Sequence, residues 1–192
     1  MKVGLLALQG ASAAHGRVFR RLGVETVDVR TPEALSAIDL IVLPGGESTT
    51  ISMMLEANGL LEPLRACLRD GLAAFGTCAG MILLASDVLD GRPDQHQLDA
   101  IDISVRRNAF GRQVDSFEAD LAVQGLDGGP MPAVFIRAPV VERVGPAVEV
   151  LARVDDRPVV CRQGRVTVAA FHPELSDDDR LHRMVLANAR ND

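Results

Sequence analysis

Apolar and polar residues alternate along this chain in blocks that predict strands followed by helices. Strands are predicted at residues 2–8, at 24–29 and at the apolar run 38–43, which is interrupted by a single aspartate. Between the first two strands, apolar residues recur every fourth position over 14–22 and predict a helix; another is expected at 51–57. Apolar runs that alternate with helices are typical of parallel strands covered on both faces. We therefore expect an α/β protein with a mostly parallel, doubly wound sheet and flanking helices.

Polar residues beside these blocks predict where the helices begin. Ser12 is expected to cap the first helix, and Ser48 or Thr49 is expected to cap the helix at 51–57. Near the end of the chain, residues 176–179 are expected to cap a last helix and to place acidic side chains in its first turn.

The second half of the chain is expected to hold shorter strands separated by polar loops. Polar residues predict a loop at 87–97, and the dense polar groups at 106–118 have a simple interpretation as a solvated, charge-paired loop. Short runs of strand-forming residues predict strands at residues 101–105, 133–137, 148–154, 158–162 and 166–171.

Composition narrows the class of protein. The length of 192 residues fits one domain, residues 1–192, with a core large enough to need no disulfide. The net charge of −6 and the absence of a basic cluster argue against nucleic-acid binding. The first apolar run is too short for a signal peptide or a membrane span, so no membrane contact is expected. Three cysteines without a paired spacing indicate a reducing compartment, and we expect a cytoplasmic protein without a metal site.

The clearest candidate for chemistry is Cys78, which has Gly76 and Gly80 two residues to either side. The apolar run 72–75 precedes this turn and the apolar run 81–85 follows it, which predicts a strand, a sharp turn and a helix. That arrangement is the thiol version of a nucleophile elbow, in which the helix N-terminus favours a thiolate. The simpler alternative is a small buried cysteine in a glycine-rich turn.

A matching base follows the predicted strand at 166–171. In an extended segment, residues two apart point the same way, so His172 and Glu174 are expected to lie side by side, with Pro173 stiffening the link. A carboxylate beside an imidazole fixes its tautomer and stabilises the imidazolium. The sequence therefore predicts a Cys78–His172–Glu174 triad, against the alternative of a strand-end histidine with a solvated glutamate.

The glycine pair Gly45-Gly46 closes the predicted strand at 38–43. Ligands bind at the carboxyl ends of strands in open parallel sheets, and adjacent glycines let backbone N–H groups turn toward a ligand. We expect Gly45 and Gly46 to supply an oxyanion-hole donor, with the Ala79 N–H as the second. A plain strand-to-helix turn is the alternative. Phosphate binding is disfavoured because no lysine follows the glycines.

These motifs resemble one family closely: the glutaminase subunits of pyridoxal 5′-phosphate synthase, within the triad (class I) glutamine amidotransferases. The elbow and the His-x-Glu pattern are shared by all triad glutaminases, whereas the segments 46–50, 107–113 and 135–139 point to this subfamily. The resemblance extends over essentially the whole chain and includes residues 4–10, 43–50, 76–82, 107–113, 135–139 and 171–175.

The resemblance implies a reaction and a partner. L-Glutamine would be hydrolysed to glutamate and ammonia, and the ammonia would pass to a partner synthase (lyase) subunit that makes pyridoxal phosphate, a form of vitamin B6. Cys78 would be the nucleophile, His172 the base and acid, and Glu174 its orienting carboxylate, with no metal or organic cofactor. Residues implied to hold glutamine are Gly46, Glu47, Ser48, Arg107, Ile136 and Arg137.

Other points stay open on the sequence alone. Residues 94–100 depart from the family pattern, and His15, which lies near a loop implied to face the synthase, is a candidate interface residue. The other histidines, His96 and His182, have no expected catalytic role, and Cys67 and Cys161 are expected to be packed or idle thiols.

Two rival functions remain. One is another triad glutaminase, such as the subunit that feeds imidazole glycerol phosphate synthesis. The other is a redox sensor on the same fold, with oxidation at Cys78. Within the preferred function, we expect low activity for the free glutaminase and higher activity with its partner.

Overall fold

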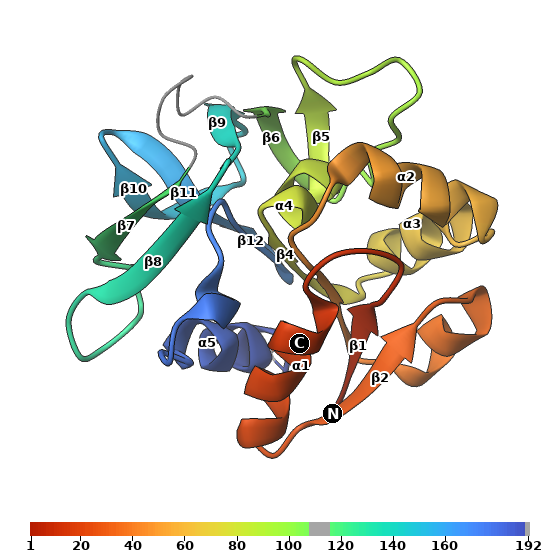
Figure 1. The fold of residues 1–192 in the computed structure, drawn as a ribbon, viewed down its shortest axis with the longest axis horizontal. Helices are drawn as coiled ribbons and strands as arrows, with labels where there is room; N and C mark the ends of the chain where they lie inside the picture. Colours follow the sequence, from red (N-terminus) through yellow and green to blue (C-terminus); the bar gives the residue numbers. More distant parts are fainter. Residues whose placement is uncertain (108–115, 191–192) are drawn as a thin grey trace.

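The structure is a computed structural model that describes residues 1–107 and 116–190 (Figure 1). Within these residues the main sheet has seven strands, in the order β10-β11-β12-β4-β3-β1-β2. Five of them run parallel: β1 (Lys2–Leu6), β2 (Glu25–Val29), β3 (Leu40–Leu43), β4 (Ala73–Thr77) and β12 (Val166–Ala169). An antiparallel extension at one edge consists of β11 (Arg157–Gln163) and β10 (Glu149–Val154).

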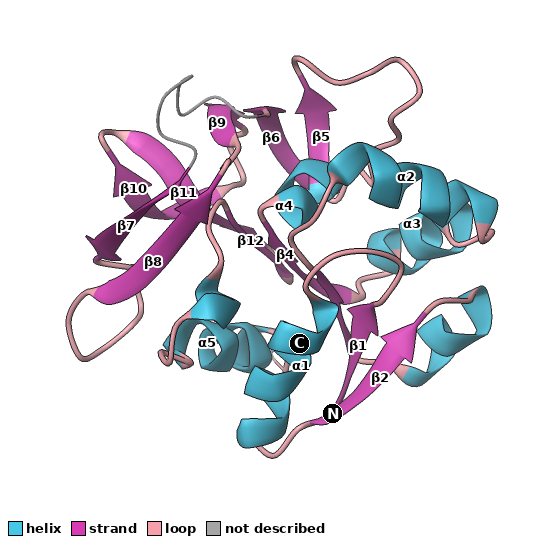
Figure 2. Ribbon diagram, in the orientation of Figure 1, coloured by secondary structure: helices cyan, strands magenta, loops and turns pink. Residues whose placement is uncertain are grey.

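Helices cover both faces of this sheet (Figure 2). One face carries α1 (Ser12–Arg21) and α5 (Arg180–Asn188), which both contact Phe75 of β4 through a histidine. The opposite face carries α2 (Ser48–Ala57), α3 (Leu61–Arg69) and α4 (Ala79–Leu84). Two 3₁₀ turns complete the helical elements of the described residues, η1 (Pro32–Ala37) and η2 (Pro173–Leu175). The expected doubly wound, mostly parallel α/β fold is confirmed.

Central strands explain why the sequence shows continuous apolar runs. Every residue of β3 is fully buried, and so are Ala73, Ala74 and Phe75 of β4, because helices lie on both faces. Leu43 pairs with Gly76 at the carboxyl end of the two strands. Burying side chains such as Ile41 and Leu43 contributes about 1.5–3 kcal/mol each before entropic costs, so this region holds the strand ends in fixed positions.

Two smaller sheets stand beside the main one. A three-stranded sheet contains β5 (Ala85–Val88), β6 (Ile101–Arg106) and β9 (Val140–Val144), and an antiparallel ribbon contains β7 (Ser116–Leu121) and β8 (Met131–Ile136). The stacked rings of Phe117 and Phe135, 4.4 Å between centroids, join the two strands of the ribbon. The His172 N–H donates to the Val134 carbonyl oxygen over 2.8 Å, so the ribbon is tied to the segment that leaves β12.

Two predicted helix caps are wrong, and the third is right in position only, because Asp179 is the N-cap residue of α5 but makes no side-chain capping hydrogen bond. Ser12 is the first residue of α1 and makes no capping hydrogen bond. Glu47, rather than Ser48 or Thr49, caps α2, because its carboxylate accepts from the backbone N–H groups of Thr49 and Thr50 at 3.2 and 2.7 Å. The acidic residues 177–179 precede α5 instead of occupying its first turn.

Three strands were missed or mistaken for loops. The strand β5 covers the start of the predicted loop 87–97, β7 covers the end of the predicted loop 106–118, and β9 was not predicted. In β7, exposed positions alternate with partly buried ones and the exposed side chains are polar, so the segment resembles a loop in composition. Residues 108–115 of that predicted loop lie outside the described residues. Every helix in the described part of the chain is too short or too polar to cross a membrane.

Candidate active site

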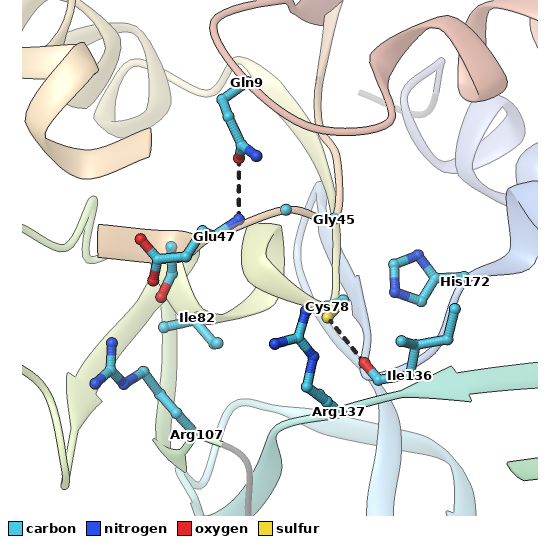
Figure 3. Close-up of a pocket in the computed structure, with 11 residues that line it drawn as sticks. Gln9, Gly45, Glu47, Cys78, Ile82, Arg107, Ile136, Arg137 and His172 are labelled. Atoms are coloured by element: carbon cyan, nitrogen blue, oxygen red, sulfur yellow. Dashed lines mark hydrogen bonds between the residues drawn. The ribbon is translucent and has the colours of Figure 1, made fainter. Parts of the chain in front are cut away.

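Four neighbouring parallel strands deliver side chains and backbone to one cavity of about 370 Å³ (Figure 3). The segments that follow β1, β3, β4 and β12 supply Gln9, Gly45, Cys78 and His172 respectively. This convergence follows from the topology, because the carboxyl ends of adjacent parallel strands share one edge of the sheet. The residues that line the cavity are Gln9, Gly45, Gly46, Glu47, Ser48, Cys78, Ile82, Arg107, Ile136, Arg137 and His172.

Cys78 occupies the strained turn that the sequence predicted. Its φ of 49° and ψ of −104° are unusual for a residue with a side chain. A Cβ on Gly76 would lie 2.7 Å from the Gly80 carbonyl group, and one on Gly80 would overlap the Leu43 carbonyl oxygen. Both flanking glycines are therefore required for α4 to approach β3 and β4 this closely. The Cys78 N–H donates to the Ala169 carbonyl oxygen over 2.9 Å, which holds the turn against β12.

His172 and Glu174 lie side by side, although for a different reason than expected. Strand β12 ends at Ala169, and Pro173 begins the turn η2, so the pair does not share an extended strand. The turn nevertheless brings His172 Nδ1 to 2.8 Å from Glu174 Oε1. The Glu174 side chain is fully buried behind His172 and does not line the cavity.

Electrostatics favour a charged His172. Burial of the ring opposes its charge and is the largest single effect, yet hydrogen bonds with Cys78 and Glu174 raise the pKa of His172 to about 10. Burial also opposes ionisation of Glu174, but His172 and His15 together lower the pKa of that carboxyl. At neutral pH the site therefore contains an imidazolium between the sulfur atom and a carboxylate.

The glycine loop is fixed by two contacts from the segment after β1. The Ala11 N–H donates to the Gly45 carbonyl oxygen over 3.0 Å, and Gln9 Oε1 accepts from the Glu47 N–H at 2.9 Å (Figure 3). The peptide bond between Gly45 and Gly46 is trans, so the Gly46 N–H points in the opposite direction from the Gly45 carbonyl oxygen. Since Ala11 binds that oxygen, the N–H points away from the segment after β1. The second expected donor, Ala79, is the buried first residue of α4, directly after Cys78.

The predicted glutamine-binding residues all line the cavity. Glu47 turns its carboxylate back to cap α2, while its backbone N–H donates to Gln9 and its carbonyl oxygen accepts from the Ile51 N–H. Arg107 is held by Thr49 Oγ1 and Gln95 Oε1, at 2.9 and 3.1 Å from its Nη1. Arg137 follows β8 with a φ of 44° and enters the cavity near Ile136. Two arginines in one small cavity suit a carboxylate-bearing ligand.

Three residues that line or support the cavity were not identified from the sequence. Gln9 could have been found from its place at a strand end, where ligands bind. Ile82 gave no signal, because one apolar residue in an apolar helix looks like core. Gln95 lies in the segment 94–100 that departs from the family pattern, and it is buried against Thr49 and Arg107.

The proposed interface role of His15 is wrong for this chain, since His15 is fully buried between α1 and Glu174. Cys161 is a packed thiol whose pKa burial raises to about 11, and Cys67 is half-buried. Within residues 1–107 and 116–190, no group of three or more histidine, cysteine or acidic side chains is arranged to hold a metal ion.

Comparison with known families and proteins identifies the family of this chain. The family model of the SNO glutamine amidotransferase family matches residues 5–190. A protein of Frankia alni named pyridoxal 5′-phosphate synthase subunit PdxT is 56% identical over 190 residues, covering 99% of this chain and 96% of the relative. A protein of the same name from Nocardia farcinica is 59% identical over 187 residues, covering 95% of this chain and 83% of the relative.

Solved structures give the same result for the fold. A crystal structure described as a glutamine amidotransferase superposes with a TM-score of 0.92 at 49% identity, covering 97% of this chain and 98% of that one. A glutamine amidotransferase of Thermotoga maritima superposes with a TM-score of 0.62 at 13% identity, covering 97% and 81% of the two chains. The second likeness is one of fold alone.

Proposed function

This chain belongs to the SNO glutamine amidotransferase family, and from that premise we propose how its own residues hydrolyse glutamine. It is a glutaminase subunit of pyridoxal 5′-phosphate synthase, and it supplies ammonia from glutamine for the synthesis of that cofactor. We treat residues 1–192 as one glutaminase domain. The finer assignments concern the residues of the triad, the substrate contacts and the synthase (lyase) subunit that receives the ammonia.

The first half-reaction forms a thioester. The Cys78 thiolate attacks the side-chain amide carbon of L-glutamine, and a C–S bond forms as the carbonyl electrons move onto oxygen. N–H groups of Ala79 and of the Gly45-Gly46 loop stabilise that oxyanion. The His172 imidazolium gives its proton to the amide nitrogen, the C–N bond breaks, and ammonia leaves.

The second half-reaction restores the enzyme. Neutral His172 takes a proton from water, the resulting hydroxide attacks the thioester carbon, and the C–S bond breaks to release glutamate and the thiolate. Glu174 stays ionised throughout and holds the ring of His172 through its Nδ1–H. No step requires a group that the chain lacks.

The substrate is held by the rest of the cavity. Arg107 lies near Thr49 and is the better placed partner for the α-carboxylate of glutamine, because the guanidinium group pairs with carboxylates in a bidentate manner. Arg137 and the carbonyl group of Ile136 lie near Cys78, where the Ile136 oxygen is 3.8 Å from Sγ. Backbone groups of Gly46, Glu47 and Ser48 complete the opposite wall.

One observation carries the proposal: the residues of all four strand ends and both arginines face the same cavity as the strained Cys78. The test is the release of glutamate from L-glutamine by this chain, with and without the pyridoxal 5′-phosphate synthase subunit. We expect low release by the free chain, strong stimulation by the synthase subunit, and none from the Cys78→Ala variant.

Other outcomes separate the rivals. Full residual ammonia release by Cys78→Ala would remove Cys78 from the mechanism. Equal rates with and without the synthase subunit would contradict activation by the partner. Stimulation only by an imidazole glycerol phosphate synthase would favour the other triad glutaminase, and sulfenic acid at Cys78 without any glutaminase activity would favour a redox sensor.

A further inference from the structure

Two buried histidines lie behind the triad, and the mechanism above does not use them. His15 of α1 and His182 of α5 are both fully buried. His15 Nδ1 is 3.0 Å from His182 Nε2, so the two rings share one hydrogen bond. Phe19 and Phe75 pack edge-on against the His182 ring, at centroid distances of 5.2 and 5.6 Å. The pair therefore sits in an apolar compartment, where an unpaired charge is costly.

The other nitrogen of His15 faces the active site. His15 Nε2 lies 3.3 Å from Glu174 Oε2 and 3.1 Å from Thr77 Oγ1, in the residue directly before Cys78. The second carboxylate oxygen, Glu174 Oε1, is the one that contacts His172. Within the described residues Glu174 Oε2 makes no hydrogen bond, so the 3.3 Å approach of His15 Nε2 is an electrostatic contact, and the hydrogen bond of His15 Nε2 is the one with Thr77. His15 thus lies between the strand that carries the nucleophile and the acid of the triad.

Neutrality of both rings limits how their protons are arranged. Burial lowers the pKa of His15, although Glu174 opposes this effect and the nearby His172 adds to it. Burial, helped by His15 and Arg21, also lowers the pKa of His182 to about 3, although Glu174 and Asp179 act in the opposite direction. Each ring therefore carries a single N–H at neutral pH.

Only one arrangement of these two protons avoids repulsion between a ring lone pair and the Glu174 carboxylate and also leaves no buried N–H without an acceptor. His15 Nε2 must carry its proton, because a lone pair there would face the Glu174 carboxylate. His15 Nδ1 is then an acceptor, so His182 Nε2 donates to it. That choice leaves His182 Nδ1 as a bare acceptor, and of the four ring nitrogens of this pair His182 Nδ1 is the one without a hydrogen-bond partner among the described residues. The reverse choice would bury an unpaired N–H, which proteins avoid more strictly than an unpaired acceptor.

We propose that His15 is a positioning residue of the triad and that His182 fixes its tautomer, so that a relay of oriented N–H groups runs from His182 to His15, whose Nε2–H bonds with Thr77 and faces Glu174 Oε2. The relay turns the Nε2–H dipole of a neutral His15 toward Oε2 of Glu174, which favours the carboxylate orientation that aligns Oε1 with His172 without placing a cation beside it. This inference rests on the proposed glutaminase function for its kinetic test, but its structural test is independent of that function.

The structural test is the tautomer of His15 in the free chain, read from the nitrogen chemical shifts of its ring by NMR at neutral pH. The relay requires a neutral His15 that is protonated at Nε2, and a neutral His182 protonated at Nε2. A His15 protonated at Nδ1, or a charged His15, would overturn the proposal. This measurement tests the relay even if glutamine is not the substrate.

The kinetic test uses glutamate release by the complex with the synthase subunit. Replacing both histidines together, His15→Phe with His182→Phe, removes the N–H that faces Glu174 and leaves no unpaired ring nitrogen in the compartment. We expect kcat to fall roughly 10- to 100-fold with KM for glutamine within about twofold, as is usual for groups that orient a reacting residue through another side chain. His15→Gln keeps an N–H donor and is expected to recover most of that loss.

Matched controls separate positioning from stability. His96 lies on the surface, with a side chain that is 36% exposed, so His96→Phe is expected to change nothing. An unchanged kcat in the double phenylalanine variant, with wild-type complex active, would overturn the positioning role while leaving the glutaminase function intact. Absence of glutamate release from the wild-type complex would instead count against the proposed function, and the tautomer would still decide for or against the relay.

Discussion

Gly45 lies against the ring of His172 so closely that a Cβ on Gly45 would overlap ring atom Cε1 and lie 3.0 Å from Nδ1. The loop proposed to stabilise the oxyanion is therefore in direct contact with the proposed base. The φ of Gly45 does not lie in the left-handed region, so an alanine is permitted by the backbone and excluded by the ring. Contact with His172, rather than conformational freedom, is what requires glycine here.

Replacing this glycine tests the contact. In Gly45→Ala the ring of His172 or the loop must move, and we expect kcat for glutamate release to fall at least about 10-fold, with a loss of unfolding free energy of about 1–3 kcal/mol from overpacking. Steady-state kinetics of the synthase complex and urea unfolding measure the two effects. Gly91→Ala is the control, because a Cβ there comes no closer than 3.2 Å to any atom; equal losses in both variants would contradict the explanation.

Strain at Cys78 predicts a difference between two inactive variants. Alanine keeps the unfavourable φ of 49°, whereas glycine adopts it freely. Both Cys78→Ala and Cys78→Gly are expected to lose glutamate release, but the glycine variant should be more stable than the alanine variant by about 1 kcal/mol. Urea unfolding of the two variants measures this difference. An alanine variant as stable as the glycine variant would mean that the turn stores no strain.

The pKa of His172 predicts how stability depends on pH. Because folding raises this pKa to about 10 from an ordinary value near 6.5, the protonated ring stabilises the fold fully below pH 6.5. That contribution is lost as the pH rises from about 6.5 through about 10. We expect urea unfolding to show that the difference in unfolding free energy between wild type and His172→Gln shrinks over this range, and a constant difference would contradict the raised pKa.

The same pKa should depend on the nucleophile. Of the effects that raise the pKa of His172, the hydrogen bond with Cys78 is the largest. In Cys78→Ala, NMR titration of the His172 ring should therefore give a lower pKa than in wild type. An unchanged pKa would indicate that Glu174 alone holds the charge on His172.

Gln95 is expected to set the affinity for glutamine through Arg107. Its side-chain oxygen accepts from both Arg107 and Thr49, at 3.1 Å in each case, so it fixes the guanidinium at the edge of the cavity. Gln95→Ala should raise KM for glutamine by several-fold, on the order of 1 kcal/mol for a hydrogen bond that orients a charged group, with a smaller effect on kcat.

A neighbouring residue supplies the control for Gln95. Gln97 lies in the same segment, and it is its backbone oxygen that is bound by Arg65. Gln97→Ala should therefore leave KM unchanged. Equal increases of KM in the two variants would point to a general loosening of residues 94–100 and not to Arg107.

Local sequence patterns determined the fold class and the proposed reacting residues. The apolar runs at 38–43 and 72–75 identified buried parallel strands, and the glycines around Cys78 identified a sharp turn at the end of one of them. Because parallel strands align their carboxyl ends, chemistry at several strand ends could be assigned to one site before any contact was known. The proposed triad depends on this rule and on short spacings alone.

Tertiary structure alone decided which polar groups contact one another across the chain. Glu47 became the cap of α2 where Ser48 or Thr49 was expected, and Gln95 became a partner of Arg107. The position of His15 near a loop suggested a surface residue, yet the packing of α1 against α5 buries it beside Glu174. Periodicity reports which face of an element is apolar. It carries no information on which distant side chain meets a buried polar atom, because that pairing depends on how separate elements pack together.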